Sequence, residues 1–561
     1  MELTGAKIIV ECLLEQSVDT VFGYPGGAVL PLYDALYDKS DEITHVLTAH
    51  EQGASHAADG YARSTGKVGV CIATSGPGAT NLVTGIATAQ MDSVPLVAIT
   101  GNVPVSLLGK DSFQEVDISG VTMPITKHNY IVKDVRELAY IIREAFEIAQ
   151  SGRPGPVLID IPKDVQTNIC EYQKYVPKNC EYVCERLSQE SMDEAISLLE
   201  KSENPMCYVG GGVIIADASE KVRQFIDKID APSCVSLMGC GAIRSDSHRY
   251  TGLVGMHGSK VSNVSVNNCD LLIVIGARFS DRVVSKASSF ARNAKIIQID
   301  VDPAEIDKNI ATTCHLLGDI NVVLDQLMAK IKKPLVHKDW MDTVAQYKKR
   351  FPLLTNQESK RASEVIHLMS DILGEDDIVT TEVGQHQIWA AQFVNHKKPR
   401  RFLTSGGLGT MGYGTGASIG AQMGNKNSRV VNIAGDGCFR MNSNELTTIK
   451  RYNLPIIILV MNNHTLGMVR QWQTLFYKGH YSQTTLDTPI DWLLLAQAYG
   501  IEGRRILPQD DAKAILEEAF SLNKPVVIDL EIPIDDKVFP IVPPGNSIKD
   551  MQGVVEVTDV I

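Results

Sequence analysis

Two apolar runs in the last third of the chain each end in side chains that carry oxygen. Residues 430–434 run into a Gly-Asp-Gly turn around Asp436, and residues 456–461 run into an Asn pair that ends in Asn463. Each run is typical of a buried strand, and residues 444–452 between them have helical spacing. A strand–helix–strand unit joins parallel strands, so both strand ends open on one edge of a sheet. We therefore predict that Asp436 and Asn463 offer oxygen ligands to Mg²⁺ in one crevice.

Glycine turns after a strand also occur in nucleotide-binding motifs. A dinucleotide-binding G-x-G-x-x-G motif would need glycine where the chain has Arg440, and no P-loop motif occurs. Taken alone, a Gly-Asp-Gly turn is ordinary turn chemistry more often than a metal site. The Asn pair at the next strand end favours the metal site, and Gly435 and Gly437 would let the backbone approach a bulky anion.

Glu51 is a second candidate for chemistry. It follows His50 at the start of an alanine-rich segment, "HEQGASHAADGYARSTG". A zinc motif H-E-x-x-H would need histidine where the chain has Ala54, so we reject zinc. The plain alternative is a solvated glutamate in the first helical turn. The small alanine side chains instead predict close helix packing and a partly buried Glu51, whose raised pKa would suit proton exchange with a neutral base.

Three segments are rich in glycine: residues 22–36 and 73–101, each a predicted turn between a strand and a helix, and residues 404–424. The first two could each hold an anion at a helix start, or could equally be tight turns. The third is so rich in glycine that we expect a large flat ligand to lie against its backbone. Met411 lies within it, and core packing is the plain alternative for that side chain.

Composition excludes several classes of protein. The 561 residues carry 53 basic and 66 acidic side chains, a net charge of −13 without a basic stripe, so we expect no nucleic-acid partner. No apolar run reaches membrane-spanning length, and the amphipathic N-terminus predicts neither signal nor transit peptide. Eleven scattered cysteines without a C-x-x-C pair fit a reducing cytoplasm.

Strand and helix patterns alternate in three stretches of the chain. They cover residues 1–165, 191–335 and 361–535. We predict that residues 166–190 form a linker and that residues 536–561 form a C-terminal tail, which contains several prolines. We predict an α/β fold of three doubly wound, parallel-sheet domains.

Several of these motifs together resemble thiamine-diphosphate (ThDP) enzymes. They are Glu51 in "HEQGA", "TSGPGATN", the glycine tract around Met411, and "GDG" with the last Asn of "NN" 27 residues after its Asp. More narrowly, the chain is similar to the catalytic subunit of the acetohydroxyacid (acetolactate) synthase family. That likeness runs from about residue 4 to about residue 553 and rests on "FGYPGGAVLP", "DSFQEVDI", "TKHNYIV", "SGRPGPVLIDIPKDV", "EVGQHQIWAAQ", "GMVRQWQTLFY" and "FPIVPPG".

The resemblance implies pyrimidine-binding, FAD-binding and diphosphate-binding domains in that order. It implies that Asp436, Asn463 and the backbone carbonyl of Thr465 bind Mg²⁺, which holds the ThDP diphosphate. The carbonyl of Gly409 and the side chain of Met411 would hold the cofactor bent. The residues expected beside the diphosphate are Gln385, His386, Gly435 and Gly437.

The remaining catalytic assignments also follow from the resemblance. Glu51 would bond the cofactor's aminopyrimidine ring. Gly27, Gln114 and Lys127 match positions near the reacting centre, although Lys127 alone could equally be a surface charge. Trp472 would select the second substrate, whereas an isolated Trp would more often be a core residue.

The middle domain resembles the flavin-binding form of the family in "GMHGS", "GARFSDRV" and "IDVDPAEIDKN". The flavin contacts that this implies are Arg153, His257, Arg278, Asp300 and Asp319. Five residues depart from the family pattern, namely Asn102, Ser280, the pair Thr415-Gly416, and His480; Ser280 bears on FAD affinity.

The function that the resemblance implies is condensation of two pyruvates, or of pyruvate with 2-oxobutanoate, with loss of CO₂. Expected partners are a second copy of the chain, as a homodimer or homotetramer with sites between subunits, and a separate small regulatory subunit. The rival functions are a pyruvate oxidase or decarboxylase, and a non-catalytic regulator that would have lost Glu51 or Asp436.

Overall fold

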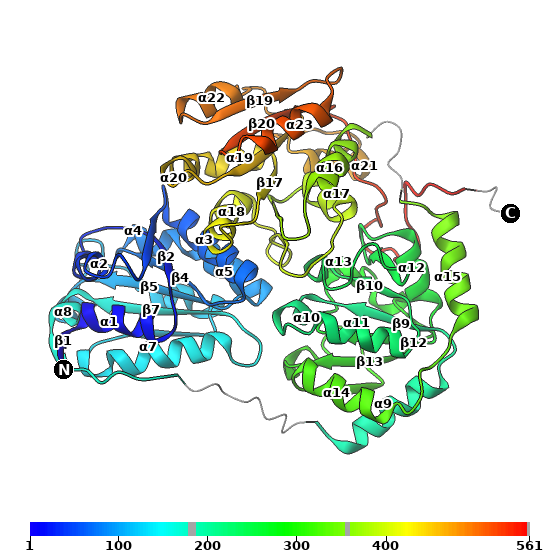
Figure 1. Cartoon of the computed structure of the whole chain (residues 1–561), viewed down its shortest axis with the longest axis horizontal. Coiled ribbons are helices and arrows are strands. Elements are labelled where there is room, and N and C mark those ends of the chain that lie inside the picture. Colours follow the sequence, from blue (N-terminus) through cyan, green and yellow to red (C-terminus); the bar gives the residue numbers. More distant parts are fainter. Residues whose placement is uncertain (178–186, 354–359, 558–561) are drawn as a thin grey trace.

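The computed structural model describes residues 1–177, 187–353 and 360–557, and it contains three α/β units, each built on a six-stranded sheet (Figure 1). Figure 1 shows the N-terminal unit in blue and cyan, the middle unit in green and the C-terminal unit in yellow to orange. All neighbouring strands within the three sheets are parallel. The predicted fold class is therefore confirmed.

The N-terminal unit has the strand order β3-β2-β4-β5-β7-β6. These strands are β2 (Thr20–Tyr24), β3 (Thr44–Leu47), β4 (Gly69–Ala73), β5 (Leu96–Asn102), β6 (His128–Ile131) and β7 (Pro156–Pro162). Its main helices are α1 (Gly5–Glu15), α2 (Leu30–Tyr37), α3 (Glu51–Thr65), α5 (Val83–Asp92) and α7 (Val135–Gln150). Beyond residue 165, β8 (Ile169–Glu171) pairs with β1 (Glu2–Thr4) and so belongs to this unit.

The middle unit has the strand order β11-β10-β9-β12-β13-β14. These strands are β9 (Pro205–Val209), β10 (Ser233–Val235), β11 (Tyr250–Leu253), β12 (Leu271–Ile275), β13 (Lys295–Asp300) and β14 (Cys314–Leu317). Its longer helices are α9 (Gln189–Lys201), α11 (Ser219–Lys228), α12 (Lys260–Asn268), α14 (Ile320–Lys330) and α15 (Lys338–Arg350).

The C-terminal unit has the strand order β16-β15-β17-β18-β20-β19. These strands are β15 (Ile378–Thr381), β16 (Phe402–Leu403), β17 (Val430–Gly435), β18 (Ile456–Asn462), β19 (Glu502–Ile506) and β20 (Val526–Glu531). Its helices include α16 (Lys360–Ile372), α17 (Gln385–Phe393), α18 (Tyr413–Gly424), α19 (Asp436–Asn442), α20 (Leu446–Arg451), α21 (Gly467–Phe476), α22 (Trp492–Ala498) and α23 (Ala512–Ser521).

The two apolar runs that suggested a metal site are β17 and β18. They are adjacent and parallel, with Val430 opposite Ile456, and every residue of β18 is buried. The connecting segment differs from the prediction, because a helix begins at Asp436 itself rather than at residue 444. It passes through a short 3₁₀ turn, Ser443–Glu445, into α20. Asp436 thus lies in the first turn of a helix, where a carboxylate is favoured by the helix dipole.

The N-terminal and C-terminal units meet where α3 packs on α18 (Figure 1). A Cβ at Gly416 would lie 2.7 Å from the Cβ of His56, and one at Gly420 would collide with the carbonyl of Ala57. Small residues on both helices therefore allow this close contact, as the alanine-rich sequence of α3 predicted.

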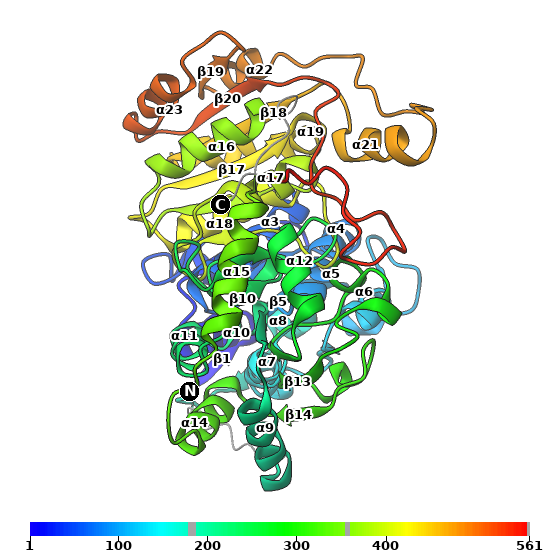
Figure 2. The same cartoon turned by 90° about the vertical axis from the view of Figure 1, so that its right-hand side faces the viewer.

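The segment after residue 535 crosses from the C-terminal unit to the middle unit. Figure 2 shows it in red. The Val542 amide donates to the carbonyl of Met256 at 2.8 Å, and the Asn263 side chain donates to the carbonyl of Ile548 at 2.9 Å. No helix among the described residues is long and apolar enough to cross a membrane.

Candidate active site

A small cavity of about 60 Å³ lies at the ends of β17 and β18. Residues predicted to bind the metal or the cofactor line it together: Gln385, His386, Met411, Gly435, Asp436, Gly437, Asn463 and Thr465. They come from four separate segments of the C-terminal unit. The crevice predicted between neighbouring strand ends is therefore present.

Asp436 is the one acidic residue that lines this cavity. Its side-chain atom Oδ1 is buried without a hydrogen-bond partner, and burial raises the pKa of Asp436 to about 6. The Oδ1 of Asn463 accepts a hydrogen bond from the Thr465 amide at 3.2 Å. Among the described residues, no group of three or more His, Cys, Asp or Glu side chains is placed to hold a metal ion. One carboxylate with neighbouring amide and carbonyl oxygens fits a hard cation that keeps other ligands.

The glycines of the Gly-Asp-Gly turn are needed for packing. A Cβ at Gly435 would lie 2.8 Å from Nδ1 of His386, and one at Gly437 would lie 2.6 Å from a methyl group of Leu466. Burial lowers the pKa of His386 to about 3, and its Nε2 has no partner. A neutral imidazole therefore faces the cavity with a free ring nitrogen.

The loop of residues 404–412, which we call the glycine loop, lies between the small cavity and a larger one. Gly409 lines the larger cavity and Met411 lines the small one. Gly409 has φ +71° and Gly412 has φ +86°, a backbone region that favours glycine. The glycines thus turn the backbone so that neighbouring residues face different cavities.

The larger cavity, of about 1760 Å³, lies where the three units meet. Its volume exceeds the ~300–1,000 Å³ of common small-molecule pockets, so it has room for an extended ligand. It is lined by all five residues predicted to contact flavin, which are Arg153, His257, Arg278, Asp300 and Asp319. It shares Val383, Gly384, Met468 and Val469 with the small cavity, so the two are adjacent.

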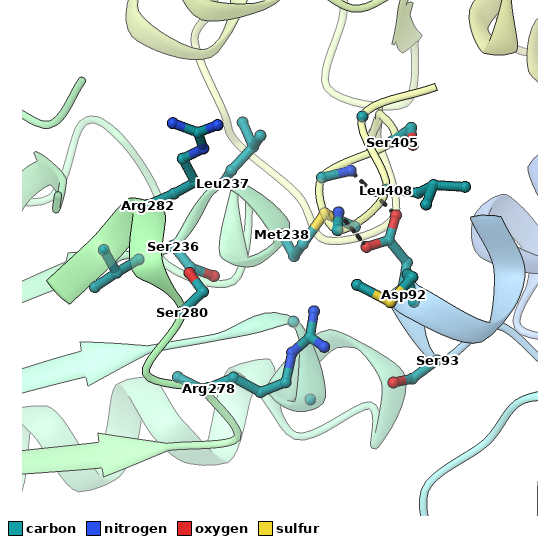
Figure 3. Close-up of a pocket in the computed structure, with 18 of the residues that line it drawn as sticks. Asp92, Ser93, Ser236, Leu237, Met238, Arg278, Ser280, Arg282, Ser405 and Leu408 are labelled. Carbon is teal, nitrogen blue, oxygen red and sulfur yellow. Dashed lines mark hydrogen bonds between the residues drawn. The ribbon is translucent and has the colours of Figure 1, made fainter. Parts of the chain in front are cut away.

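The charged groups of the larger cavity differ in how they are already paired. Arg153 forms ion pairs with Asp302 at 3.2 Å and Glu305 at 2.9 Å. Figure 3 shows Arg278 extending into the cavity, and its guanidinium has no ion pair within the part of the chain that the structure describes. Burial raises the pKa of Asp300 to about 6. Arg278 is therefore the cation most available to an anionic ligand.

Of the other predicted flavin contacts, His257 is uncharged and Asp319 caps a helix. Burial lowers the pKa of His257 to about 4, and its Nδ1 lies 3.3 Å from the carbonyl of Pro540. The Asp319 carboxylate caps α14 by accepting hydrogen bonds from the amides of Asn321 and Val322.

Trp472 lies on α21 and lines the larger cavity together with Met468. The guanidinium of Arg282 lies 5.9 Å from the centre of its ring, and Phe476 packs edge-on against it at 5.5 Å. Trp472 is thus half-buried at a cavity wall and is not a residue of the apolar core.

Three of the four predicted catalytic residues of the N-terminal unit gather at one end of its sheet. The Glu51 carboxylate accepts a hydrogen bond from Asn81 at 3.0 Å. A Cβ at Gly78 would lie 3.1 Å from Glu51, and one at Gly76 would lie 2.8 Å from the carbonyl of Gln114. Gly27 is exposed in a turn. The next residue, Ala28, donates its amide hydrogen to the hydroxyl of Thr74 at 3.3 Å, so the turn lies at the same end of the sheet.

These residues do not line either cavity within one chain. Lys127 is also separate from them. Its ammonium group donates to the carbonyls of Ile148 and Ser151 at the C-terminal end of α7, and burial lowers its pKa to about 8. The structure thus places Lys127 as a helix cap.

Sequence reasoning missed several residues that hold these elements in place. Glu445 accepts hydrogen bonds from the amides of Ala49 and His50, just before Glu51, at 3.1–3.2 Å. Gln471 bonds to Gln385 at 2.9 Å. Asp92 and Arg63 form hydrogen bonds with the backbone of the glycine loop. A charged or amide side chain on an otherwise buried helix face is the signal that would have found them.

Comparison with known proteins identifies relatives along the whole chain. Three family models match: the N-terminal TPP (thiamine pyrophosphate) binding domain over residues 3–121, the central domain over 192–327 and the C-terminal TPP binding domain over 382–530. The chain is 46% identical to the acetolactate synthase isozyme 2 large subunit of Escherichia coli over 98% of its length and 99% of the relative's. It is 45% identical to a probable acetolactate synthase large subunit of Methanocaldococcus jannaschii (98% and 95%) and 44% identical to an acetolactate synthase of Mycobacterium bovis (98% and 91%).

Proposed function

The chain belongs to the thiamine pyrophosphate (thiamine diphosphate, ThDP) enzymes as an acetolactate synthase large subunit, and from this premise we propose its substrates, cofactors and site residues. It condenses two pyruvates to 2-acetolactate and CO₂, or pyruvate and 2-oxobutanoate to 2-aceto-2-hydroxybutanoate and CO₂. Either reaction transfers a two-carbon unit and leaves the net oxidation state unchanged. The products lead to the branched-chain amino acids.

The observation that carries this proposal is the small cavity, which Asp436, Asn463 and Thr465 line together. Asp436 has a buried oxygen without a partner, which a bound Mg²⁺ would satisfy. We propose that the Asp436 carboxylate, the Asn463 amide oxygen and the Thr465 carbonyl hold Mg²⁺ and, through it, the ThDP diphosphate. Gln385 and the neutral His386 would lie against the same diphosphate.

When bound, ThDP supplies the electron sink for decarboxylation of a 2-oxoacid. The protein supports that chemistry by positioning the cofactor and by holding a proton. Gly409 and Met411 would hold the cofactor in position, and Glu51 would hold a proton at the aminopyrimidine N1′. Gly27 and Gln114 lie at the same edge as Glu51 and would contact substrate. The contacts of Lys127 support a role as a helix cap that keeps this region in place.

Glu51 would act in the site of a second subunit. It lines neither cavity of its own chain, although its proposed partner groups do. Large apolar side chains close in sequence to Gln114 and Gly27 are exposed, with Phe113 at 87% and Leu30 at 54%. Such exposed apolar surface around a catalytic carboxylate favours a homodimer or homotetramer with sites between subunits. A separate small regulatory subunit is the further partner that we expect.

We propose FAD as the ligand of the larger cavity. Arg278 would pair with its diphosphate, Asp300 would accept a hydrogen bond from a ribose hydroxyl, and Arg153, His257 and Asp319 would line its length. Ser280 stands where the family usually has an acidic residue, so we expect the contact of this position with FAD to be weaker. Because the reaction is redox-neutral, the flavin would have a structural role.

The nine described cysteines are all unpaired, which supports a reducing cytoplasm as the location.

The test uses the purified chain with ThDP, Mg²⁺ and FAD, given pyruvate alone or with 2-oxobutanoate. We expect acetolactate, and with both substrates the mixed product as well, while the visible flavin absorbance stays constant through turnover. Acetate with flavin bleaching would indicate an oxidase instead, and acetaldehyde would indicate a decarboxylase. The matched control omits Mg²⁺ and adds a chelator, which should stop product formation.

A further inference from the structure

Asp92 is a buried carboxylate at the end of α5, at the wall of the larger cavity, to which no catalytic or cofactor-binding role is assigned above. Its side chain is fully excluded from solvent. Figure 3 shows it beside the glycine loop, with hydrogen bonds to that loop drawn as dashed lines. One carboxylate oxygen accepts from the Gly407 amide at 2.7 Å, and the other accepts from the Gly406 amide at 3.1 Å. A carboxylate of the N-terminal unit thus binds the backbone of a loop in the C-terminal unit.

Arg63 on α3 completes a buried ion cluster with two carboxylates. It donates to Asp92 at 3.0 Å, to Asp59 at 2.6 Å and to the carbonyl of Thr404 at 3.0 Å. The Tyr413 hydroxyl donates to Asp59 at 2.7 Å. Two carboxylates and one guanidinium leave one negative charge in excess, which the loop amides and the Tyr413 hydroxyl must solvate. The cluster is therefore satisfied only when the loop is in this position.

The loop is shaped to fit between Asp92 and the middle unit. A Cβ at Gly407 would lie 2.7 Å from the Asp92 carboxylate, and one at Gly406 would collide with the sulfur of Met238. Near the other end of the loop, the Thr410 hydroxyl lies 2.7 Å from that of Thr88 on α5. Both ends of the glycine loop are thus attached to the N-terminal unit of the same chain.

We propose that Asp92 and Arg63 are positioning residues that fix the glycine loop in the conformation that receives the cofactor. A loop with this much glycine samples many backbone conformations unless outside contacts select one. Pre-organising it removes that ordering cost from cofactor binding. The proposal rests on the proposed function only in assigning Gly409 and Met411 to ThDP; the attachment of the loop is independent of it.

The test compares Asp92→Asn with a matched control, Glu15→Gln. Asparagine has the size of aspartate, but it has only one side-chain oxygen. It therefore cannot accept hydrogen bonds from both loop amides and from Arg63 as Asp92 does. Glu15 is likewise a fully buried carboxylate of the N-terminal unit, bonded to Arg143, Tyr172 and a backbone amide, and it lines neither cavity. Hydrogen exchange of the cofactor-free protein is measured for residues 404–412, and ThDP affinity is measured by titration in the presence of Mg²⁺.

For Asp92→Asn we expect loop exchange about tenfold faster and a ThDP dissociation constant about tenfold higher, the factor that corresponds to ~1.4 kcal/mol. Glu15→Gln should lower the melting temperature and leave both quantities unchanged. Unchanged loop exchange in folded Asp92→Asn would overturn the proposal.

If Asp92→Asn does not fold, a second variant tests the same proposal. Arg63→Lys keeps the positive charge and removes the guanidinium group that donates to Asp92 and to the carbonyl of Thr404. Faster exchange at residues 404–407 supports the proposal, and unchanged exchange overturns it. If ThDP does not protect the wild-type loop, the assignment of Gly409 and Met411 fails instead, while the exchange of the cofactor-free variants still tests the attachment.

Discussion

The side-chain amide of Gln385 donates a hydrogen bond to Oε1 of Gln471 at 2.9 Å. Gln385 lines the small cavity, whereas Gln471 lies on α21, the helix that carries Met468 and Trp472 into the larger cavity. Gln471 also bonds to both main-chain groups of Val538, at 2.8 and 2.9 Å. The residue proposed to lie beside the diphosphate is therefore bonded to the helix that carries the residue proposed to select the acceptor.

Replacing Gln471 by leucine should loosen α21 and weaken acceptor selection. We expect the preference for 2-oxobutanoate over pyruvate to fall about fivefold, because a displaced wall loses part of the ~10-fold or greater discrimination that one methylene allows. The ratio of the two products at fixed pyruvate measures this. Gln422→Leu is the control, since Gln422 is also buried and bonded to main-chain carbonyls but lines neither cavity. A parallel change in both variants would mean a general loss of stability.

Trp472→Leu should keep acetolactate formation and lose most of the preference for 2-oxobutanoate. A smaller side chain leaves a gap where the extra methylene of that acceptor would pack. The expected fall is about tenfold, which corresponds to ~1.4 kcal/mol, within the ~1–3 kcal/mol that a methylene is worth in an apolar pocket. Competition between the two acceptors at fixed pyruvate is the measurement. An unchanged ratio with the fold intact would move acceptor selection to Met468 or Phe113.

Asp436→Ala should abolish Mg²⁺-dependent binding of ThDP. Activity should fall on the order of 100-fold or more, because charge stabilisation by a bound metal ion is worth several kcal/mol. Titration of ThDP with and without Mg²⁺ measures the effect directly. Asp325→Ala, at a side chain that is 61% exposed, serves as the control. Wild-type affinity in Asp436→Ala would remove this residue from the metal site.

Mixed subunits can show whether Glu51 acts in its partner's site. Glu51→Gln and Asp436→Ala should each be inactive alone. In a mixed dimer, one site would combine both substitutions and the other would be intact. Random exchange of equal amounts should therefore restore up to about one quarter of wild-type activity in a two-fold symmetric dimer. No recovery after demonstrated exchange would place both residues in the site of one chain.

Asp160 should make stability depend on pH. Burial raises the pKa of this carboxyl to about 7, even though Thr100 and Asn102 donate hydrogen bonds to it. An unfolded aspartate loses its proton near pH ~4, so the folded protein binds more protons between pH ~4 and ~7 and is destabilised as the pH rises through that range. Asp160→Asn removes this loss, because the neutral amide can bond to the same partners.

The expected gain from Asp160→Asn is on the order of 2 kcal/mol at pH 8 and close to zero at pH 4, relative to wild type. Melting temperatures of both proteins across this pH range provide the check. A constant difference between them would show that Asp160 keeps an ordinary pKa.

The sequence by itself determined the elements and the edge of the sheet where the small cavity lies. Apolar runs such as residues 430–434 and 456–461 encode buried strands locally, and parallel strands joined by a crossover must end on one edge. That geometry brings Asp436 and Asn463 to the same crevice without knowledge of any other contact. Specific motifs then identified the family, because a glutamate, a Gly-Asp-Gly turn and an Asn pair recur together in one order.

Only the tertiary structure decided how the units hold one another. Asp92 meets Gly406 and Gly407 across more than three hundred residues of chain, and Gln471 meets Gln385 between two helices. No local sequence pattern predicts such contacts, because each depends on how distant segments of the chain pack together. The same applies to Lys127, whose partners are carbonyls at the end of α7, and to Glu51, which the fold holds away from both cavities of its own chain. Side-chain type and spacing specify the chemistry that is available, whereas packing between distant segments specifies which groups meet.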